Sequence, residues 1–245
     1  MNSDFEMVKT VQVQRSRMNR LFRIFLKIAA WFAGLSVFFV FLFKWVPVPI
    51  TPLMLIRCVQ QKSAGKPVIL KHDWVSMKKI SPHFQLAVVC SEDQNFMNHL
   101  GFDLEAIGKA VGESKQGSKR LRGASTISQQ TAKNVFLWPQ RSWVRKGLEV
   151  WFTGLIELLW GKKRILEVYL NSIEMGNGIY GAEAASKQYF GISASGLTKY
   201  QAAAITAILP SPLKYNARSP GPYVQSRIEW ITGQMQQVAP LPFIK

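Results

Sequence analysis

Acidic residues are scarce in this sequence. It has 14 Asp and Glu residues against 31 Lys and Arg residues, which gives a formal net charge of +17. An excess of this size favours an anionic partner, and it leaves open nucleic acid, an anionic lipid surface and a phosphorylated substrate. Three of the few acids, Glu92, Asp93 and Asp103, nevertheless lie in one short stretch around His99. We therefore treat residues 90–103 as a candidate site.

Cysteine and histidine are also few, with two Cys and three His residues in the chain. Cys58 and Cys90 form no C-x-x-C pair and no Cys/His ligand spacing, so we predict no metal site and no disulfide framework. Gly176, Gly178 and Gly181 match the dinucleotide pattern G-x-G-x-x-G. In a dinucleotide site a strand precedes the glycines and an acid follows about twenty positions later. Here the preceding segment, ILEVYLN, predicts a helix, and no acid follows at that distance. We accordingly predict no cofactor.

One long uncharged run lies near the N-terminus, Ile28–Phe43 (IAAWFAGLSVFFVFLF). At about 1.5 Å per residue it spans roughly 24 Å, short of a ~30 Å hydrocarbon core, but the flanking Lys27 and Lys44 can reach the interface. A buried core helix is an alternative, although this segment is apolar on every face. A cleaved signal peptide is another, although the following KWVPVPITP lacks a small-x-small cleavage site. We predict an uncleaved transmembrane anchor over residues 28–45.

Basic residues are denser before this run than after it. Those before it are Arg15, Arg17, Arg20, Arg23 and Lys27. The positive-inside bias therefore predicts a cytoplasmic basic tail over residues 1–27 and a domain outside the cytoplasm over residues 46–245. Because that domain lies outside the cytoplasm, we expect no nucleic-acid partner, and we favour a phosphorylated lipid or the membrane surface.

The rest of the chain carries helix signals and few strand signals. Ser81-Pro82 is typical of an N-cap followed by proline, Thr198 and Gln201 form a capping box, and Gly191 is placed to end a helix. Apolar residues recur with helical period over 142–160, 162–171, 181–190 and 223–238. We predict a mainly α domain. Residues 112–123 (GESKQGSKRLRG) predict a mobile basic loop.

Two further segments combine groups suited to an anionic or sugar ligand. Gly123–Asn134 reads GASTISQQTAKN, which is nearly all uncharged donors and acceptors, with Lys133 supplying a charge. Both a solvated helix face and a ligand site are consistent with it. Arg145 and Glu149 lie at i and i+4 on one helix face. They predict either a surface ion pair or a buried pair whose arginine also holds an anion.

Five motifs together resemble the signature motifs of the peptidoglycan glycosyltransferases, glycosyltransferase family 51. In order they are E-D-x-x-F-x-x-H-x-G-F-D at 92–103, G-A-S-T-I-S-Q-Q-T-A-K-N at 123–134, R-K-x-x-E at 145–149, K-x-x-I-L-E-x-Y-L-N at 162–171 and G-x-G-x-Y-G-x-x-A-A-x-x-x-Y-F at 176–190. The resemblance implies a lysozyme-like helical fold behind one transmembrane helix, on the periplasmic side of the inner membrane. It also implies polymerisation of lipid II into glycan strands, with release of undecaprenyl diphosphate. Since few residues follow the last motif, we expect a monofunctional member without a transpeptidase domain.

The resemblance also implies roles for single residues. Glu92 is similar to the family's catalytic base, and Glu149 is similar to its second, assisting carboxylate. Residues that contact the diphosphate and sugar of the donor are expected at Ser125, Gln130, Lys133, Arg141 and Arg145. Three supporting roles follow from the residues themselves. Asp93 points away from the adjacent Glu92 and is expected to brace backbone donors. His99 and Asp103 are expected to brace the loop, with direct contact to the ligand as the alternative. The implied partners are lipid II, the growing glycan chain and the membrane, with the cell-wall synthesis machinery as a further candidate.

These residues suit the implied reaction, which inverts the anomeric carbon. A sugar 4-hydroxyl is a weak nucleophile, and a carboxylate that accepts its proton accelerates attack by ~10²–10⁴-fold. The leaving diphosphate gains negative charge, which Lys and Arg groups stabilise. Two alternatives stay open. One is a lytic transglycosylase or muramidase-type enzyme, whose substrate gives no reason for a cationic site. The other is a non-enzymatic, cationic binding module tethered to the membrane.

Overall fold

The computed structural model describes residues 2–106, 108, 112, 125–239 and 241–243, with side chains from residue 19 onward. The chain divides into two compact units, Met1–Phe43 and Lys44–Lys245. The predicted mobile loop lies outside the described residues from residue 113 to its end.

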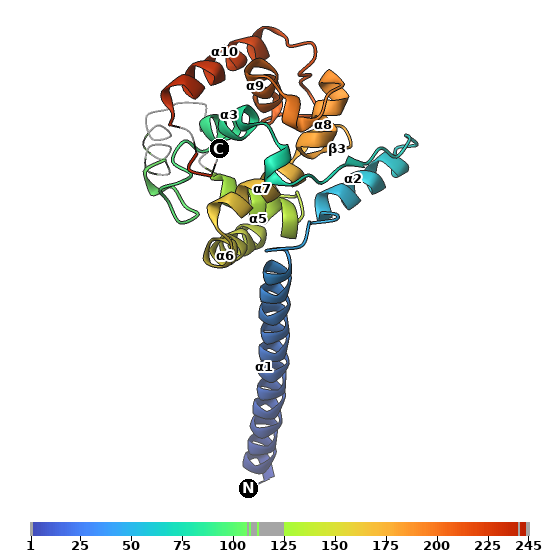
Figure 1. The fold of residues 1–245 in the computed structure, drawn as a ribbon. Helices are drawn as coiled ribbons and strands as arrows, with labels where there is room; N and C mark the ends of the chain where they lie inside the picture. The colour runs from blue at the N-terminus through green and yellow to red at the C-terminus, as the bar shows by residue number, and fades with distance from the viewer. Residues whose placement is uncertain (1, 107, 109–111, 113–124, 240, 244–245) are drawn as a thin grey trace. The chain divides into compact units, whose positions relative to one another are not determined.

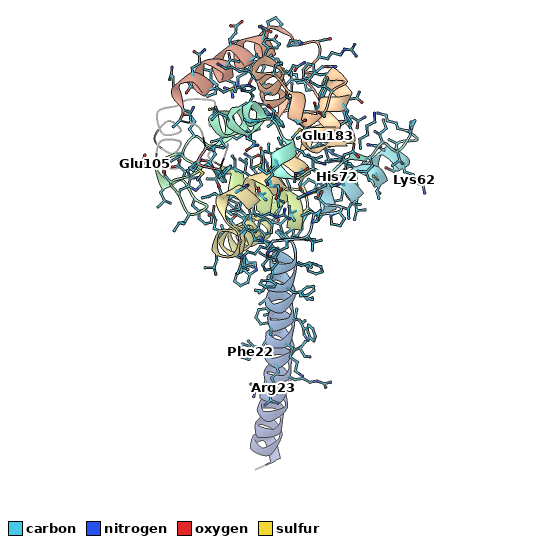
Figure 2. All side chains as sticks on the ribbon, viewed as in Figure 1. Phe22, Arg23, Lys62, His72, Glu105 and Glu183 are labelled. Carbon is cyan, nitrogen blue, oxygen red and sulfur yellow. The ribbon has the colours of Figure 1, made fainter. Side chains whose placement is uncertain are left out.

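The first unit consists of one helix, α1 (Asn2–Leu42). Its segment Asn19–Leu42 has a mean hydropathy of 2.1 and is long and apolar enough to cross a membrane. Figure 2 shows the side chains of Phe22 and Arg23 projecting outward from α1. The helix fits a membrane anchor, and it begins well before residue 28 because Arg and Lys are good helix formers that continue the helix into the basic tail.

The second unit is mainly helical, as the sequence predicts (Figure 1). Its α-helices are α2 (Pro52–Ser63), α3 (Pro82–Glu92), α5 (Ile127–Phe136), α6 (Trp143–Leu159), α7 (Lys162–Ser172), α8 (Gly181–Phe190), α9 (Lys199–Ile208) and α10 (Pro222–Gln237). Among the described residues there are also two short 3-10 helices, Met77–Lys79 and Ala194–Gly196.

Two groups of helices build the core of this unit. Helix α3 packs on α9 and α10, while α5 packs on α6 and α7 (Figure 1). Helix α9 carries Ala202, Ala203 and Ala204, all fully buried, and these small side chains let its neighbours approach closely. Phe84 of α3 and Ile165 of α7 are among the large side chains with no exposed surface. The last residue of α3, Glu92, accepts a hydrogen bond from Gln130 of α5, so this end of α3 links the two groups.

A small sheet lies beside α8. Its strands are β1 (Lys71–His72), β2 (Glu174–Gly176) and β3 (Ile179–Tyr180), in the order β1-β3-β2, with β1 parallel and β2 antiparallel to β3. Gly178 and Gly181 have φ of +69° and +81°, and a Cβ at either would clash with a backbone carbonyl group, at Ile69 or Asn171. The glycine pattern at 176–181 thus serves a tight turn and close backbone packing.

Most of the helix signals in the sequence are confirmed. Helices α6, α7, α8 and α10 occupy the predicted ranges, the Thr198–Gln201 capping box forms, and Gly191 ends α8 with φ of +70°. The prediction that Ser81 is the N-cap of α3, followed by Pro82, is confirmed, but the Ser81 side chain makes no capping hydrogen bond. The helix begins where expected, but the Ser81 hydroxyl donates to the Leu197 carbonyl at 2.8 Å, because burial against that segment offers a tertiary acceptor.

Candidate active site

The two adjacent acids at the end of α3 face different partners. Glu92 is the last residue of the helix and accepts hydrogen bonds from Gln130 Nε2 at 3.0 Å and from Ser91 Oγ at 3.3 Å. Asp93, the next residue, accepts from His99 Nε2 at 3.0 Å and from the backbone N–H of Ile127 at 3.0 Å. Glu92 is partly exposed, whereas Asp93 is buried. Only Glu92 is therefore placed to meet a ligand.

Burial decides the ionisation of Glu92. It raises the pKa of this carboxyl group above the usual value for glutamate, against the hydrogen bonds from Gln130 and Ser91 and the positive charges of Arg227 and Lys133. A carboxylate with a raised pKa is a better proton acceptor than an ordinary one, provided that it remains ionised at the working pH. The surrounding donors and cations favour the ionised form.

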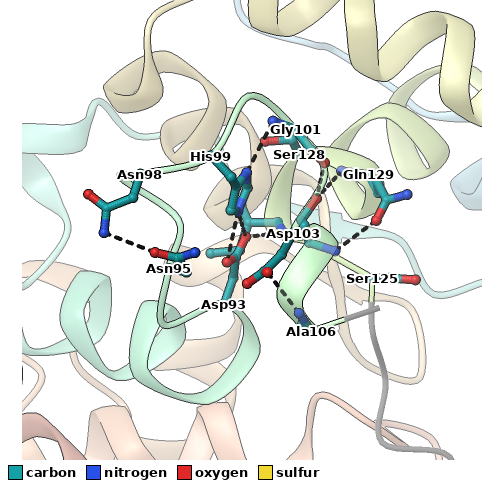
Figure 3. Close-up of polar contacts among 12 residues, drawn as sticks. Asp93, Asn95, Asn98, His99, Gly101, Asp103, Ala106, Ser125, Ser128 and Gln129 are labelled. Atoms are coloured by element: carbon teal, nitrogen blue, oxygen red, sulfur yellow. Dashed lines mark hydrogen bonds and ion pairs between the residues drawn. The ribbon is translucent and has the colours of Figure 1, made fainter. Parts of the chain in front are cut away.

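Asp93 and His99 form a buried, hydrogen-bonded pair, the brace of this site (Figure 3). The backbone N–H of Gly101 donates to His99 Nδ1 at 3.1 Å, so the ring proton lies on Nε2 and points at Asp93. Asp93 also caps the start of α5 through Ile127, where a negative charge suits the helix dipole. The brace thus ties the end of α3 to the start of α5.

Asp103 makes a separate and more local contact. Its Oδ1 accepts from the backbone N–H of Ala106 at 2.9 Å, at the start of the helical residues 104–106 (Figure 3). Gly101 itself has φ of +86°, and its carbonyl accepts from Thr126 Oγ1 at 2.7 Å. Asp103 therefore shapes the loop and makes no described contact with Glu92.

Helix α5 places two predicted ligand residues next to each other. Thr126 and Gln129 form a capping box at its start, which fixes the direction of the helix. Gln130 then reaches Glu92, and Lys133 follows on the adjacent turn, partly buried. Ser125, just before the helix, is exposed, and its carbonyl oxygen lies 3.5 Å from Gln130 Nε2. The polar segment of the sequence is thus a helix whose first turns line the neighbourhood of Glu92.

Lys133 interacts electrostatically with both Glu149 and Glu92. Burial lowers the pKa of Lys133, the charge of Glu149 raises it, and Arg145, Lys146 and Arg141 lower it further. Lys133 also interacts electrostatically with Glu92. A lysine held among other cations in a partly buried place is suited to an anion that enters from solvent.

On α6, Arg145 and Glu149 form a buried pair and not a surface one. Arg145 Nη1 lies 3.2 Å from Glu149 Oε2, and the two side chains are only 10% and 5% exposed. The more exposed Lys146 contacts the other oxygen, Glu149 Oε1. Arg145 Nε is buried and has no hydrogen-bond partner among the described residues. Arg141 is exposed at the start of the helix. This cluster therefore carries more positive charge than Glu149 neutralises.

Two side chains at this site were not predicted from the sequence. Arg227 of α10 donates to Ser91 Oγ at 3.0 Å, and Tyr169 of α7 donates to Gln130 Oε1 at 3.2 Å. Both lie far from Glu92 in sequence, so no local spacing indicates the contact. In the part of the chain with described placement, no group of three His, Cys, Asp or Glu residues is arranged to hold a metal ion.

Comparisons with known proteins agree on one family. The sequence model of the transglycosylase family matches residues 62–236. A biosynthetic peptidoglycan transglycosylase of Pseudomonas putida (strain W619) is 53% identical over 208 residues, which are 85% of this chain and 88% of that protein. Proteins with the same name from Pseudomonas aeruginosa PAO1 and Bacteroides thetaiotaomicron are 51% and 53% identical, over 89% and 86% of this chain and 94% and 85% of theirs.

Proposed function

This chain belongs to the transglycosylase family, and we propose that it polymerises lipid II into the glycan strands of peptidoglycan, with release of undecaprenyl diphosphate. The observation that carries this proposal is the placement of one partly exposed carboxylate, Glu92, within electrostatic reach of the cation Lys133. The reaction needs a proton acceptor beside the attacking hydroxyl and positive charge beside the diphosphate that leaves.

Glu92 is the proposed general base. It accepts the proton of the acceptor sugar's 4-hydroxyl as that oxygen attacks the anomeric carbon of the donor, with inversion. The raised pKa of Glu92 strengthens it as a base, and the donors from Gln130 and Ser91 hold its two oxygens in place. General base catalysis of this kind supplies about 10²–10⁴-fold in rate.

The cations of α5 and α6 are the proposed site of the leaving diphosphate. Lys133 and Arg145 face it from partly or fully buried positions, and Arg141 adds an exposed charge. Ser125 and Gln130 lie where they can contact the donor sugar. The positive charge of Lys133, Arg141 and Arg145 is already in place before the reaction, so little reorganisation is needed as charge builds on the leaving group.

Glu149 is the proposed assisting carboxylate, and its contacts suggest how it assists. Both of its oxygens engage cations, Arg145 and Lys146, and it lies 5% exposed. It holds these cations against their mutual repulsion and leaves the Arg145 Nε without an acceptor. In this account Glu149 acts through the cationic cluster and takes no proton from the sugar.

The N-terminal helix is the proposed membrane anchor. We assign residues 1–27 to the cytoplasm, 28–45 to the inner membrane and 46–245 to the periplasm, where lipid II is presented. Supporting this are the apolar segment Asn19–Leu42 and the arginines that precede residue 28. An enzyme whose substrate is anchored in a bilayer gains effective concentration when it is anchored in the same bilayer.

A matched pair of variants tests the function. The purified full chain in detergent is given labelled lipid II, and polymer formation is compared for wild type, Glu92→Gln and Glu229→Gln. Glu229 is an exposed carboxylate on α10 and serves as the control. We expect loss of polymerisation by about 10²–10⁴-fold in Glu92→Gln and wild-type rates in Glu229→Gln. Wild-type rates in both would remove Glu92 from the mechanism.

A further inference from the structure

A buried tyrosine is linked to the proposed base through one intervening residue. Tyr169 of α7 is 1% exposed, and its hydroxyl donates to Gln130 Oε1 at 3.2 Å. Gln130 of α5 donates in turn from Nε2 to Glu92 Oε2 at 3.0 Å. The chain of hydrogen bonds crosses three helices, from α7 through α5 to the end of α3.

The chemistry of the three groups favours one arrangement. An amide oxygen only accepts and an amide nitrogen only donates, so a hydroxyl that donates to Gln130 Oε1 favours the orientation in which Nε2 faces Glu92. Donation to the oxygen also polarises the amide and strengthens its N–H as a donor. The reverse orientation would bring the amide oxygen against the carboxylate, which an ionised Glu92 disfavours.

Tyr169 is well suited to remain a donor. Burial, followed by the charges of Glu92 and Asp93, raises the pKa of its hydroxyl well above the ordinary value for tyrosine. The hydroxyl therefore keeps its proton throughout the range in which a glycosyltransferase works. Tyr169 itself contacts neither Glu92 directly nor, at 1% exposure, any ligand in solvent.

We propose that Tyr169 is a positioning residue, which orients the Gln130 amide and thereby keeps a hydrogen-bond donor on Glu92 Oε2. The inference rests on the proposed role of Glu92 as the base. Tyr169 lies on α7, where that helix packs against α5, and packing alone would need its ring but not its hydroxyl. The proposal gives the hydroxyl a role in the reaction.

The other groups around Glu92 act on it independently of Tyr169. Ser91 donates to the second oxygen, Oε1, and is itself held by Arg227 of α10. Lys133 of α5 and Arg227 contribute positive charge, and the adjacent Asp93 is turned toward His99. Removing the Tyr169 hydroxyl therefore disturbs one oxygen of Glu92 and leaves the contacts of the other intact.

Tyr169→Phe is the direct perturbation, because it removes the hydroxyl and keeps the ring that fills the core. Tyr189→Phe is the matched control, since Tyr189 is also a buried tyrosine, at 8% exposure, and its hydroxyl donates to the Met175 carbonyl at 2.8 Å. The first readout needs no substrate. The carboxyl carbon of Glu92 is titrated by NMR in the full chain in detergent, and its signal is identified by its loss in Glu92→Gln.

We expect the Glu92 titration to move to higher pH in Tyr169→Phe and to stay unchanged in Tyr189→Phe, because a donor to the ionised form is weakened in the first variant only. The second readout is the pH dependence of kcat with lipid II. In Tyr169→Phe, kcat should fall about three- to tenfold on the acid side and approach the wild-type value at high pH. A loss of this size is smaller than the full contribution of a hydrogen bond to a charged group, because the Gln130 donor is weakened and not removed.

A third variant tests the intermediate group without changing the core. Gln130→Leu, at a partly exposed position, should by itself move the Glu92 titration to higher pH, because it removes the donor to Oε2. In that background Tyr169→Phe should cause no further shift of the Glu92 titration. An unchanged titration in Tyr169→Phe, an equal loss of kcat at every pH, or a second shift in the double variant would each overturn the inference.

These outcomes separate the inference from the proposed function. If wild type makes no polymer from lipid II but the Glu92 titration shifts in Tyr169→Phe, the positioning contact stands and the proposed function fails. If wild type polymerises lipid II and the titration does not shift, the inference alone fails.

Discussion

The buried carboxylate of the cationic cluster gives a prediction with a magnitude. Glu149→Gln removes the charge that faces Arg145 Nη1 at 3.2 Å, where the two side chains are 5% and 10% exposed. Breaking a buried pair from one side typically costs ~3–5 kcal/mol, because the remaining charge is left without compensation. Glutamine still offers one oxygen, and Lys146 at 45% exposure adds little, so we expect the lower end, about 3 kcal/mol.

Such a loss is measurable by thermal unfolding. For a domain of this size a change of 3 kcal/mol lowers Tm by about 6–12 °C. The full chain in detergent is compared as wild type, Glu149→Gln and the exposed control Glu229→Gln, which should stay within about 2 °C of wild type.

Added inorganic pyrophosphate sharpens this test. It should raise the Tm of Glu149→Gln more than that of wild type, because the cations near residue 149 are then less neutralised and bind the anion more tightly. A Tm for Glu149→Gln within about 2 °C of wild type would refute the claim that this carboxylate holds the cluster together. An equal response of both proteins to pyrophosphate would refute the claim that the cluster receives the diphosphate.

Three further predictions concern single residues. Burial keeps the folded-state pKa of Glu92 above its unfolded value, so stability is lost as pH rises through the folded-state pKa and Glu92 ionises. The Tm of Glu92→Gln should therefore exceed that of wild type at pH 8 and match it at pH 4, and the reverse pH trend would contradict this. Gly178→Ala places a Cβ against the Ile69 carbonyl at φ +69° and should lower the free energy of unfolding in urea by about 2–5 kcal/mol. Gly233→Ala, with open space around it, should not lower that free energy, and similar losses for both variants would contradict the role of Gly178 in the turn. Lys133→Ala should lower kcat with lipid II by about tenfold or more, because it removes a cation proposed to face the leaving diphosphate. Lys163→Ala, an exposed charge on α7, should leave kcat within about twofold, and equal losses would mean that the two lysines act only through total charge.

Local signals predicted most of the helices. Thr198 and Gln201 are three residues apart, and the apolar period of α6 is visible within its own segment, so neither needs information from the rest of the chain. Helix α2 was not predicted, although Thr51 and Pro52 stand at its start, because its two faces are not clearly divided into polar and apolar residues. The short strands β1 and β3 were missed since two-residue pairings are set by neighbours distant in sequence.

In the site, too, contacts within one helix can be predicted from the sequence and contacts between helices cannot. Gln130 and Lys133 could be placed together because they share one helix, as could Arg145 and Glu149. The meeting of Tyr169 with Gln130 could not be predicted, because it depends on how α7 packs against α5. The sequence also offered two competing interpretations of the Arg145–Glu149 pair, and only burial distinguishes them.

The most direct test of the account follows the fate of labelled lipid II with the purified full chain in detergent. The account predicts a ladder of long glycan chains and free undecaprenyl diphosphate, and none of these products with Glu92→Gln. If the wild-type chain leaves lipid II unchanged and instead releases short anhydro-sugar fragments from finished cell wall, the cationic cluster has no leaving diphosphate to bind and the central claim is contradicted.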